Sequence, residues 1–456
     1  MANYDITPVA VPHVRTKYRT IKTKMPVPES LPILRSLRKS EPRSMAGQPP
    51  VIWHRADGFT VGDRWGNRWI DWSSGVVMTN AGHGVREVRE ALLKKIDQGL
   101  LASYVFVHED RAALTRQLQR LSPDPDNYEV FLLSTGSEAT ENCIKLSKTY
   151  AIEKYGPKKR YFVSFINAFH GRTMGSQLAG GMQRQKKWMG TTADSSFVQV
   201  PFPDGFKNED QSFELFLRSL KKLGVAPKDI AGIMTESFQG VGPDFMPVGY
   251  ARKLEAFCRK HDIVLTMDEV QAGFGRTGRM FTFEHYGIKP DLIACGKGIS
   301  SSLPLSAVIG RRDILDLYPP GSMTSTHSGS PLCVAAALAS VRTIAKGPLI
   351  RNAAKLGKIL LPELQRIRAK HPLALGWASG LGLVGGIQVV KPGTKQPDPE
   401  TATAINVKCY QRGLLMFAPV GIGGECLKIA PPLCITEAAL REGLAVLEKA
   451  CDEVLS

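Results

Sequence analysis

The chain has no long hydrophobic run, and its first residues do not predict a secretion signal. No window of about 18 uncharged apolar residues occurs, so no transmembrane helix is predicted. The first residues, Met1-Ala2-Asn3-Tyr4-Asp5, lack the apolar core of a signal peptide. The eight cysteines include no Cys-x-x-Cys pair, and the nine histidines include no His-x-x-x-His pair. These absences argue against a disulfide framework and a metal site, and they favour reduced thiols in the cytoplasm.

The charge balance shows an excess of basic residues. The net charge is +17, but the basic residues are scattered and no nucleic-acid motif is present. Neither nucleic acid nor a membrane is therefore expected as a partner. The excess indicates a solvated basic surface, or a cleft that attracts anionic ligands. The content of 43 glycines and 30 prolines in 456 residues suits a large globular enzyme with one big and one smaller domain.

Hydrophobic patterning divides the chain into four segments. Residues 1–45 are basic and rich in proline, which predicts an extended arm that is ordered only against another surface. Residues 46–84 are assigned to the N-terminal part of a smaller α+β domain. Residues 85–330 are assigned to the large domain. Residues 331–456 are predicted to supply a linking helix and the C-terminal part of the smaller domain.

Alternating strand and helix patterns predict an α/β fold with a mostly parallel, doubly wound sheet in the large domain. Strands are predicted at 51–54, 59–63, 68–72, 130–133, 160–165, 230–235, 263–267, 292–295, 304–310, 385–390 and 426–430. Helices are predicted at 85–98, 109–121, 140–153, 250–261 and 331–346. Residues 73–78 are expected to form a flexible loop.

Two reactive side chains follow neighbouring predicted strands. Asp268 ends the apolar run 263–267, and Lys297 stands between two glycines after the run 292–295, 29 residues later. Side chains at the carboxyl ends of parallel strands are favoured for chemistry. A carboxylate for a pyridinium nitrogen and a lysine for a Schiff base are the groups that pyridoxal 5'-phosphate (PLP) needs most.

Two further strand ends have features of a cofactor site. The strand 130–133 runs through a Gly136-Ser137 turn into a helix, and free backbone N–H groups at a helix start bind phosphate. The strand 160–165 leads to Phe169 and His170, which can cover the face of a flat ring.

Two Gly-x-Gly-x-x-Gly motifs occur, and neither is interpreted as a nicotinamide-binding site. They begin at Gly273 and Gly380, and a nicotinamide site would require a strand before the motif and a helix after it. Instead, strand-like residues follow each motif, at 280–283 and 387–390.

Together these features resemble a known family. Over roughly residues 50–450 the chain is similar to the class III (subgroup II) aminotransferases, which are fold type I PLP-dependent enzymes. The motifs that carry the resemblance are Ser134-Thr135-Gly136-Ser137-Glu138-Ala139, Phe169-His170-Gly171-Arg172-Thr173, Asp268-Glu269-Val270-Gln271, Gly275-Arg276-Thr277-Gly278, Lys297, and Thr326 in Thr-His-Ser-Gly-Ser-Pro. The resemblance implies a ping-pong transfer of an amino group from an amino acid or amine to a 2-oxo acid or aldehyde.

The resemblance also implies roles for individual residues. Lys297 would form the Schiff base and then shuttle a proton, and Asp268 would pair with the pyridinium nitrogen. The other cofactor residues implied are Gly136 and Ser137 for the phosphate, Phe169 and Val270 for the ring faces, Gln271 for the ring hydroxyl, and His170 and Glu236 around them. Thr326 would reach the phosphate of a neighbouring subunit, which implies a homodimer and leaves a tetramer open.

Several residues bear on the substrate. Val76 and Tyr104 match positions that line the substrate pocket in the family. Lys428 stands where many members have a carboxylate-binding arginine, so the usual glutamate pocket is not expected unchanged. Arg172 is a second candidate to bind a carboxylate. A racemase, epimerase or decarboxylase on the same scaffold stays open as an alternative, because these reactions begin in a similar way.

Overall fold

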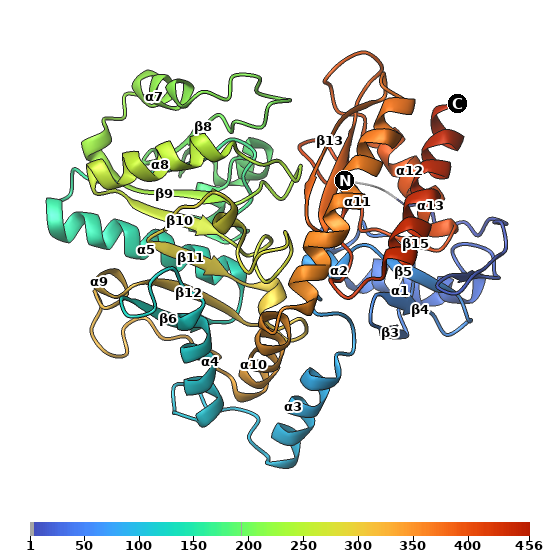
Figure 1. Ribbon diagram of the computed structural model, residues 1–456, viewed down its shortest axis with the longest axis horizontal. Coiled ribbons are helices and arrows are strands. Elements are labelled where there is room, and N and C mark those ends of the chain that lie inside the picture. The colour runs from blue at the N-terminus through green and yellow to red at the C-terminus, as the bar shows by residue number, and fades with distance from the viewer. Residues whose placement is uncertain (1–3, 193) are drawn as a thin grey trace. The chain divides into compact units, whose positions relative to one another are not determined.

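The computed structural model describes residues 4–192 and 194–456, and the chain divides into two compact units. We call Arg86–Gly240 with Asp244–Ile350 the central unit, and Met1–Val85, Val241–Pro243 and Arg351–Ser456 the terminal unit. Each unit has its own sheets, which Figure 1 shows with their labels.

The central unit is built on a seven-stranded sheet with the order β6-β12-β11-β10-β9-β7-β8 (Figure 1). Neighbouring strands run parallel, except that β12 is antiparallel to β11 and β6. The strands are β6 (Tyr128–Leu133), β7 (Tyr161–Phe165), β8 (Phe197–Val200), β9 (Ile230–Glu236), β10 (Val264–Asp268), β11 (Leu292–Cys295) and β12 (Ser306–Arg311). The fold is therefore the expected α/β type with a mostly parallel sheet.

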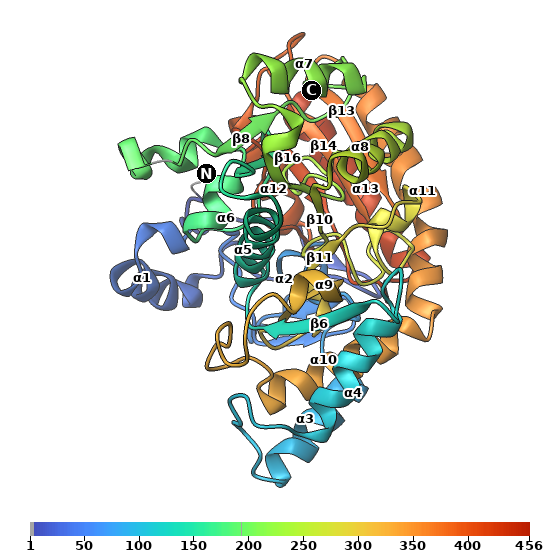
Figure 2. The same ribbon diagram turned by 90° about the vertical axis from the view of Figure 1, so that its left-hand side faces the viewer.

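Helices cover both faces of this sheet. Alternate strand residues, such as Met234 and Val264, pack with α5 in one core. On the other face, Phe165 belongs to an aromatic cluster with Phe216 of α7 and Tyr250 of α8. The helices of the unit are α3 (Arg86–Asp97), α4 (Glu109–Arg120), α5 (Gly136–Tyr155), α6 (Met174–Ala179), α7 (Phe213–Lys222), α8 (Val248–His261), α9 (Arg312–Leu315) and α10 (Pro331–Ala345). Figure 2 shows α3 and α4 beside α10.

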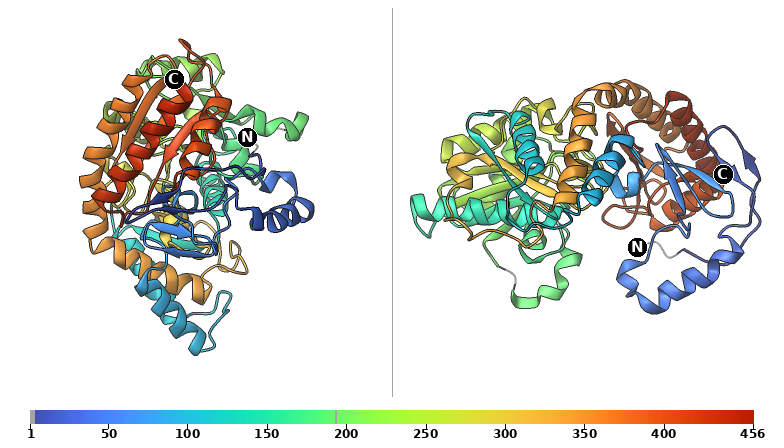
Figure 3. Two further views of the ribbon diagram at one scale, coloured as in Figure 1. Left: turned by 90° about the vertical axis from the view of Figure 1, so that its right-hand side faces the viewer. Right: turned by 90° about the horizontal axis from the view of Figure 1, so that it is seen from below.

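The terminal unit contains two sheets whose strands run mostly antiparallel and come from both ends of the chain (Figure 3). The first has the order β1-β2-β5-β4-β3, with β15 beside β5, and the second has the order β13-β14-β16. The strands are β1 (Val14–Arg15), β2 (Thr20–Ile21), β3 (Arg55–Asp57), β4 (Thr60–Gly62), β5 (Arg68–Asp71), β13 (Leu375–Leu381), β14 (Val384–Val389), β15 (Leu414–Leu415) and β16 (Cys426–Ile429). The helices are α1 (Leu31–Ser40), α2 (Ser74–Val77), α12 (Pro399–Gln411), α13 (Glu437–Leu455) and α11 (Pro348–Lys370), which begins in the central unit.

The N-terminal segment differs from the extended arm that was expected over residues 1–45. Its described part contains β1, β2 and α1, and Ile21 and Met25 are buried in one core with Trp69 and Tyr410. The burial partners lie far along the chain, so local patterning could not show them. The strand expected at 51–54 is also wrong: pairing starts at Arg55, after two prolines at 49 and 50.

The predicted flexible loop at 73–78 forms the short turn α2. Ser74, Val76 and Val77 have φ values of +47°, +66° and +63°, which residues other than glycine rarely adopt. Hydrogen bonds fix this turn, including one from Ser74 Oγ to the carbonyl of Ala430 at 2.6 Å.

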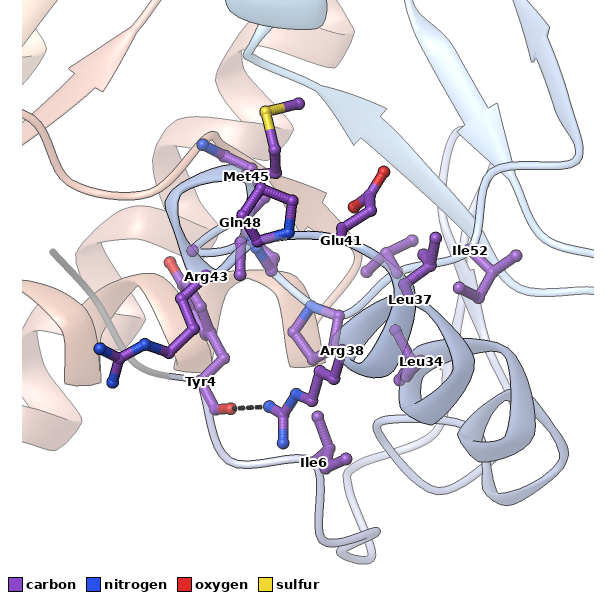
Figure 4. Close-up of a pocket in the computed structure, with 16 residues that line it drawn as sticks. Tyr4, Ile6, Leu34, Leu37, Arg38, Glu41, Arg43, Met45, Gln48 and Ile52 are labelled. Atoms are coloured by element: carbon purple, nitrogen blue, oxygen red, sulfur yellow. Dashed lines mark hydrogen bonds between the residues drawn. The ribbon is translucent and has the colours of Figure 1, made fainter.

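A cavity of about 830 Å³ lies within the terminal unit, between α1 and the segment 41–52 (Figure 4). Leu34, Leu37 and Ile52 line it together with Arg38 and Arg43. None of the residues predicted to bind cofactor or substrate lines this cavity.

Within the described residues, no single helix has the length and apolar composition to cross a membrane, although α10 and α11 pass that test together as one broken span.

Candidate active site

A cavity of about 270 Å³ opens at the carboxyl edge of the central sheet. Its lining comes from the ends of β9 and β10 and from the segments that follow β6, β7 and β11. The lining residues are Thr135, Gly136, Ser137, Phe169, His170, Gly171, Arg172, Glu236, Asp268, Val270, Gln271 and Lys297. Parallel strands bring these groups together because their carboxyl ends meet at one edge.

Asp268 is fixed at the end of β10. It is 4% exposed, and its Oδ2 accepts a hydrogen bond from His170 Nδ1 at 2.8 Å. Its Oδ1 accepts from the backbone N–H of Val270 at 3.0 Å. These two contacts hold the carboxylate in one orientation.

Lys297 follows β11 and begins a short 3-10 turn, Lys297–Ile299. Burial lowers the pKa of its amine, and the charges of Asp268 and Glu236 oppose that shift. An amine with a lowered pKa has a larger unprotonated, nucleophilic fraction at neutral pH. The turn therefore presents a reactive amine to the cavity.

The start of α5 supplies hydrogen-bond donors to the same cavity. Thr135 caps the helix: its Oγ1 accepts from the N–H of Glu138 at 3.2 Å, and the Glu138 carboxylate accepts from the Thr135 N–H at 2.8 Å. No acceptor within the described chain is recorded for the N–H groups of Gly136 and Ser137. Two N–H groups at the positive end of a 20-residue helix are suited to an anion such as phosphate.

Phe169 and Val270 are two apolar side chains that line the cavity. Val270 touches the backbone of Gly136 so closely that a Cβ there would lie 2.7 Å from its Cγ1. Phe169 is held by its backbone N–H, which donates to Glu236 Oε2 at 3.0 Å. The guanidinium carbon of Arg172 lies 5.5 Å from the centre of the Phe169 ring, and Arg172 is itself exposed.

Two glutamates near the site are buried. Burial raises the pKa of Glu236 to about 7, and it raises the pKa of Glu269 to about 7 as well. Glu236 accepts from the backbone of Phe169 and Gly240. Glu269 accepts from Ser237 Oγ and the N–H groups of 282 and 283, so it supports a loop. The strand expected at 280–283 is wrong, because these bonds favour a 3-10 helix, Thr282–His285.

The cavity does not include four of the predicted residues. Thr326 is exposed on the loop before α10, and Tyr104 is 44% exposed, with its hydroxyl 2.9 Å from Thr324 Oγ1. Val76, 45% exposed, and Lys428, 2% exposed, belong to the terminal unit.

Two lining residues had no predicted role. Thr135 could have been found from its Thr-x-x-Glu spacing, which is the capping-box pattern. Gly171 has φ +137°, and a Cβ there would collide with Ser137 and Ser176. A lone glycine in a sequence carries no such signal, because the collision depends on residues elsewhere in the chain.

Comparison with known proteins identifies the family. The family described as aminotransferase class-III matches residues 43–451. The chain belongs to the class III aminotransferases. It is 32% identical over 442 residues to a 4-aminobutyrate aminotransferase of Mycobacterium leprae, across 94% of this chain and 97% of that one. A crystal structure of a Bacillus anthracis aminotransferase matches with a TM-score of 0.83 and 28% identity, across 94% of this chain and 100% of that one.

The relatives include one with a different printed activity. The chain is 28% identical to an alanine/serine racemase of Pyrococcus horikoshii, across 99% of this chain and 97% of that protein. The family assignment establishes that this aminotransferase depends on PLP and moves an amino group from an amino acid or amine to an oxo acceptor in two half-reactions.

The cavity of this aminotransferase fits PLP. It holds an amine with a lowered pKa at Lys297 and a buried, hydrogen-bonded carboxylate at Asp268. It also has two helix-start N–H groups without a recorded acceptor in the described structure, and a buried His170 Nε2 that likewise has none. A base, an anion-binding helix start and an acceptor for a ring nitrogen are the groups that PLP requires.

Proposed function

We propose that the amino donor is an ω-amino carboxylate and that Arg172 binds its carboxylate in the central cavity. The observation that carries this proposal is the guanidinium of Arg172. It lines the same cavity as Lys297, and no hydrogen bond or ion pair is recorded for it in the described chain. The Mycobacterium leprae relative, whose name gives 4-aminobutyrate as substrate, supports this class of donor.

The same proposal assigns the cofactor residues. Lys297 holds PLP covalently, and Asp268 accepts a hydrogen bond from the ring nitrogen. The N–H groups of Gly136 and Ser137 bind the phosphate. His170 fixes the orientation of Asp268 through their 2.8 Å hydrogen bond.

Three further residues complete the proposed cofactor site. Phe169 and Val270 pack on the two ring faces, since both line the cavity and Val270 is pressed against Gly136. Gln271, which lies against Gly240, reaches the ring hydroxyl. Glu236 holds Phe169 in place by accepting a hydrogen bond from its backbone N–H.

In catalysis the lysine amine changes role. Bound PLP supplies an electron-withdrawing ring that stabilises the electrons left behind when a proton leaves the donor carbon. In the holoenzyme, Lys297 Nζ would accept that proton and later give it back. Burial favours this step because it lowers the pKa of the amine and so increases its unprotonated fraction. The second half-reaction reverses these transfers toward the oxo acceptor.

A donor panel tests the carboxylate contact. With 4-aminobutyrate, Arg172→Ala should lower kcat/KM by about 10–100-fold, the usual cost of losing a charge-assisted hydrogen bond. With butylamine, which lacks the carboxylate, the variant should equal the wild type. Arg160 is the matched control, because its guanidinium lies 5.5 Å from the ring of Tyr161 and it does not line the cavity. Equal losses with both donors would contradict carboxylate binding by Arg172.

Other substrate contacts are proposed from the family resemblance. Val76, Tyr104 and Lys428 are assigned to the substrate side of the site. Lys428 stands where many family members have an arginine. A lysine amine is a point charge and cannot form the two parallel hydrogen bonds that an arginine makes to a carboxylate. This difference favours an acceptor that is not bound through such a pair of hydrogen bonds. An unchanged rate of Lys428→Ala toward every carboxylate donor and acceptor would remove this residue from the site.

We also propose a homodimer in which Thr326 reaches the phosphate of the neighbouring subunit. Thr326 is exposed and lies outside the cavity of its own chain. Leu101, Phe106 and Val107 are 51%, 76% and 91% exposed, and such a run of apolar side chains is typical of an interface. Light scattering should give the mass of two chains, and Thr326→Ala should weaken PLP binding without splitting the dimer.

A cytoplasmic location is proposed from cysteine chemistry. None of the eight cysteines, all of which lie within the described residues, forms a disulfide, and most are buried. Free thiols are typical of reducing compartments. Cell fractionation would test the assignment.

Racemisation is the second candidate, favoured by the similarity to the Pyrococcus horikoshii racemase. Incubation of the holoenzyme with L-alanine and no oxo acid separates the two reactions. Conversion of PLP to its amine form without D-alanine supports amino transfer, and accumulation of D-alanine supports the racemase.

A further inference from the structure

The turn that carries Lys297 has an uncommon backbone conformation. Lys297 has φ +44° and Ser301 has φ +53°, both in the left-handed region. Neither residue is glycine, so each side chain crowds its own backbone, and the conformation persists only where surrounding contacts hold it. Ile299, between them, is fully buried.

Two serine hydroxyls connect this turn to α10. Ser301 Oγ lies 2.8 Å from Ser340 Oγ, and Ser340 has no exposed surface. The same two hydroxyls lie 3.3 and 3.5 Å from the carbonyl oxygen of Gly298. One hydroxyl can thus donate to the other while the second donates to Gly298, the residue directly after Lys297.

The neighbouring serines make local contacts instead. Ser300 Oγ donates to the carbonyl of Leu303, and Ser302 Oγ donates to the carbonyl of Ser300 at 3.1 Å. Both bonds close the turn on itself. Ser301 differs from its two neighbours because its hydroxyl reaches another element of the fold.

We propose that the Ser301–Ser340 pair is a positioning element for Lys297. By tying the Gly298 carbonyl to α10, the pair fixes the turn from which the amine of Lys297 projects. Neither serine lines the cavity, so both act through Lys297 rather than by touching substrate or cofactor. The proposal rests on the proposed role of Lys297 as the lysine that holds PLP.

A looser turn would change the surroundings of the amine. Asp268 on β10 and Glu236 on β9 act electrostatically on Lys297, and His170 is hydrogen-bonded to Asp268. Burial outweighs the two carboxylates and keeps the amine less basic than a free lysine. If the turn could move, water would reach the amine, and a larger fraction would be protonated at neutral pH.

The test follows the attachment of PLP to the apoenzyme over a range of pH. Attachment is trapped with borohydride, and the modified peptide is quantified by mass spectrometry. In Ser340→Ala and Ser301→Gly, the pH of half-maximal attachment rate should rise by about 0.5–1 unit, with a roughly 3–10-fold slower rate at pH 7. Ser147→Ala is the matched control: Ser147 is a fully buried serine whose hydroxyl donates to Cys143 within α5.

Ser301→Gly separates positioning from folding. Glycine adopts φ +53° without strain, so this variant should melt at or above the temperature of Ser301→Ala while showing the same shift in attachment. PLP could attach to Lys297 in the wild type, and the variants could show the same pH dependence of attachment as the wild type. That result would overturn the positioning role of the serine pair and leave the proposed role of Lys297 intact. Wild-type attachment at a different lysine would instead overturn the proposed role of Lys297.

Discussion

The two cavities of this aminotransferase differ in size and in chemistry. The cavity of the terminal unit is about 830 Å³, and the cavity of the central unit is about 270 Å³. The larger one is lined mainly by apolar side chains, together with the exposed charged residues Arg38, Glu41 and Arg43 (Figure 4). The smaller one gathers Asp268, Glu236 and Lys297 at strand ends.

The proposed site therefore rests on the convergence of buried titratable groups and not on cavity volume. Parallel strands bring the groups of the central cavity to one edge, and the fold keeps them there at the cost of burying charge. The terminal cavity lies beside α1, which has no buried residue.

The largest expected effect is at Lys297. Lys297→Ala should lower kcat by about 10³-fold or more, because both the covalent hold on PLP and the proton transfer are lost. Lys186 is the matched control: burial lowers its pKa to about 8, but it lies outside the cavity. Lys186→Ala should keep at least about half of the wild-type kcat. A comparable loss of kcat in both variants would show that activity depends on the lowered pKa of a lysine and not on its position in the central cavity.

Asp268 should have the next largest effect. Asp268→Asn keeps the shape but loses the negative charge opposite the ring nitrogen, so kcat should fall by about 10²–10³-fold. Asp291 is a buried aspartate that accepts from the N–H of Leu265, near the start of β10. Asp291→Asn should lower the melting temperature and leave kcat of the folded enzyme within about two-fold. Steady-state kinetics with calorimetry would separate the two effects.

The buried glutamates predict a pH-dependent stability. Burial raises the pKa of Glu269 from 4.5 to about 7, so its contribution to stability is complete below about pH 4.5 and is lost as the pH rises through 7. The free energy of unfolding should therefore fall by up to about 3 kcal/mol over this range for such a group. Urea unfolding at pH 5 and pH 8 should show a smaller fall in Glu269→Gln than in the wild type.

The exposed glutamate Glu90, paired with Arg86 at 2.7 Å, provides the control for that measurement. Glu90→Gln should keep the wild-type difference between pH 5 and pH 8. If Glu269→Gln also kept it, the pH dependence would have another source.

The smallest effect is expected in the terminal cavity. Leu37 is 44% exposed there, so Leu37→Ala should leave kcat/KM within about two-fold. A ten-fold loss, with PLP content unchanged, would make the larger cavity part of the active site and reverse the comparison.

The sequence predicts the central sheet better than the terminal unit. β11 was expected at 292–295 and is found at Leu292–Cys295, because a fully buried strand between glycine and proline signals is a strong local pattern. β8 and α7 were not predicted. β8 has only four residues, most of them half-buried, so its local pattern is weak. α7 buries Phe213, Phe216 and Leu220 at helical spacing, so its pattern is present in the sequence and was overlooked.

For the candidate site, the strand-end groups could be placed together from topology alone. The left-handed backbone of Lys297 and its support from Ser340 could not, because contacts between residues far apart in the chain leave no local signal. The N-terminal segment was misjudged for the same reason: Ile21 and Met25 find their partners far along the chain.

The attachment site of PLP tests the central claim most directly. Purified enzyme is loaded with PLP, reduced with borohydride, digested and mapped by mass spectrometry. The structure predicts stoichiometric modification of Lys297, the lysine that lines the 270 Å³ cavity. Modification of another lysine, with Lys297 recovered unmodified, would contradict the account.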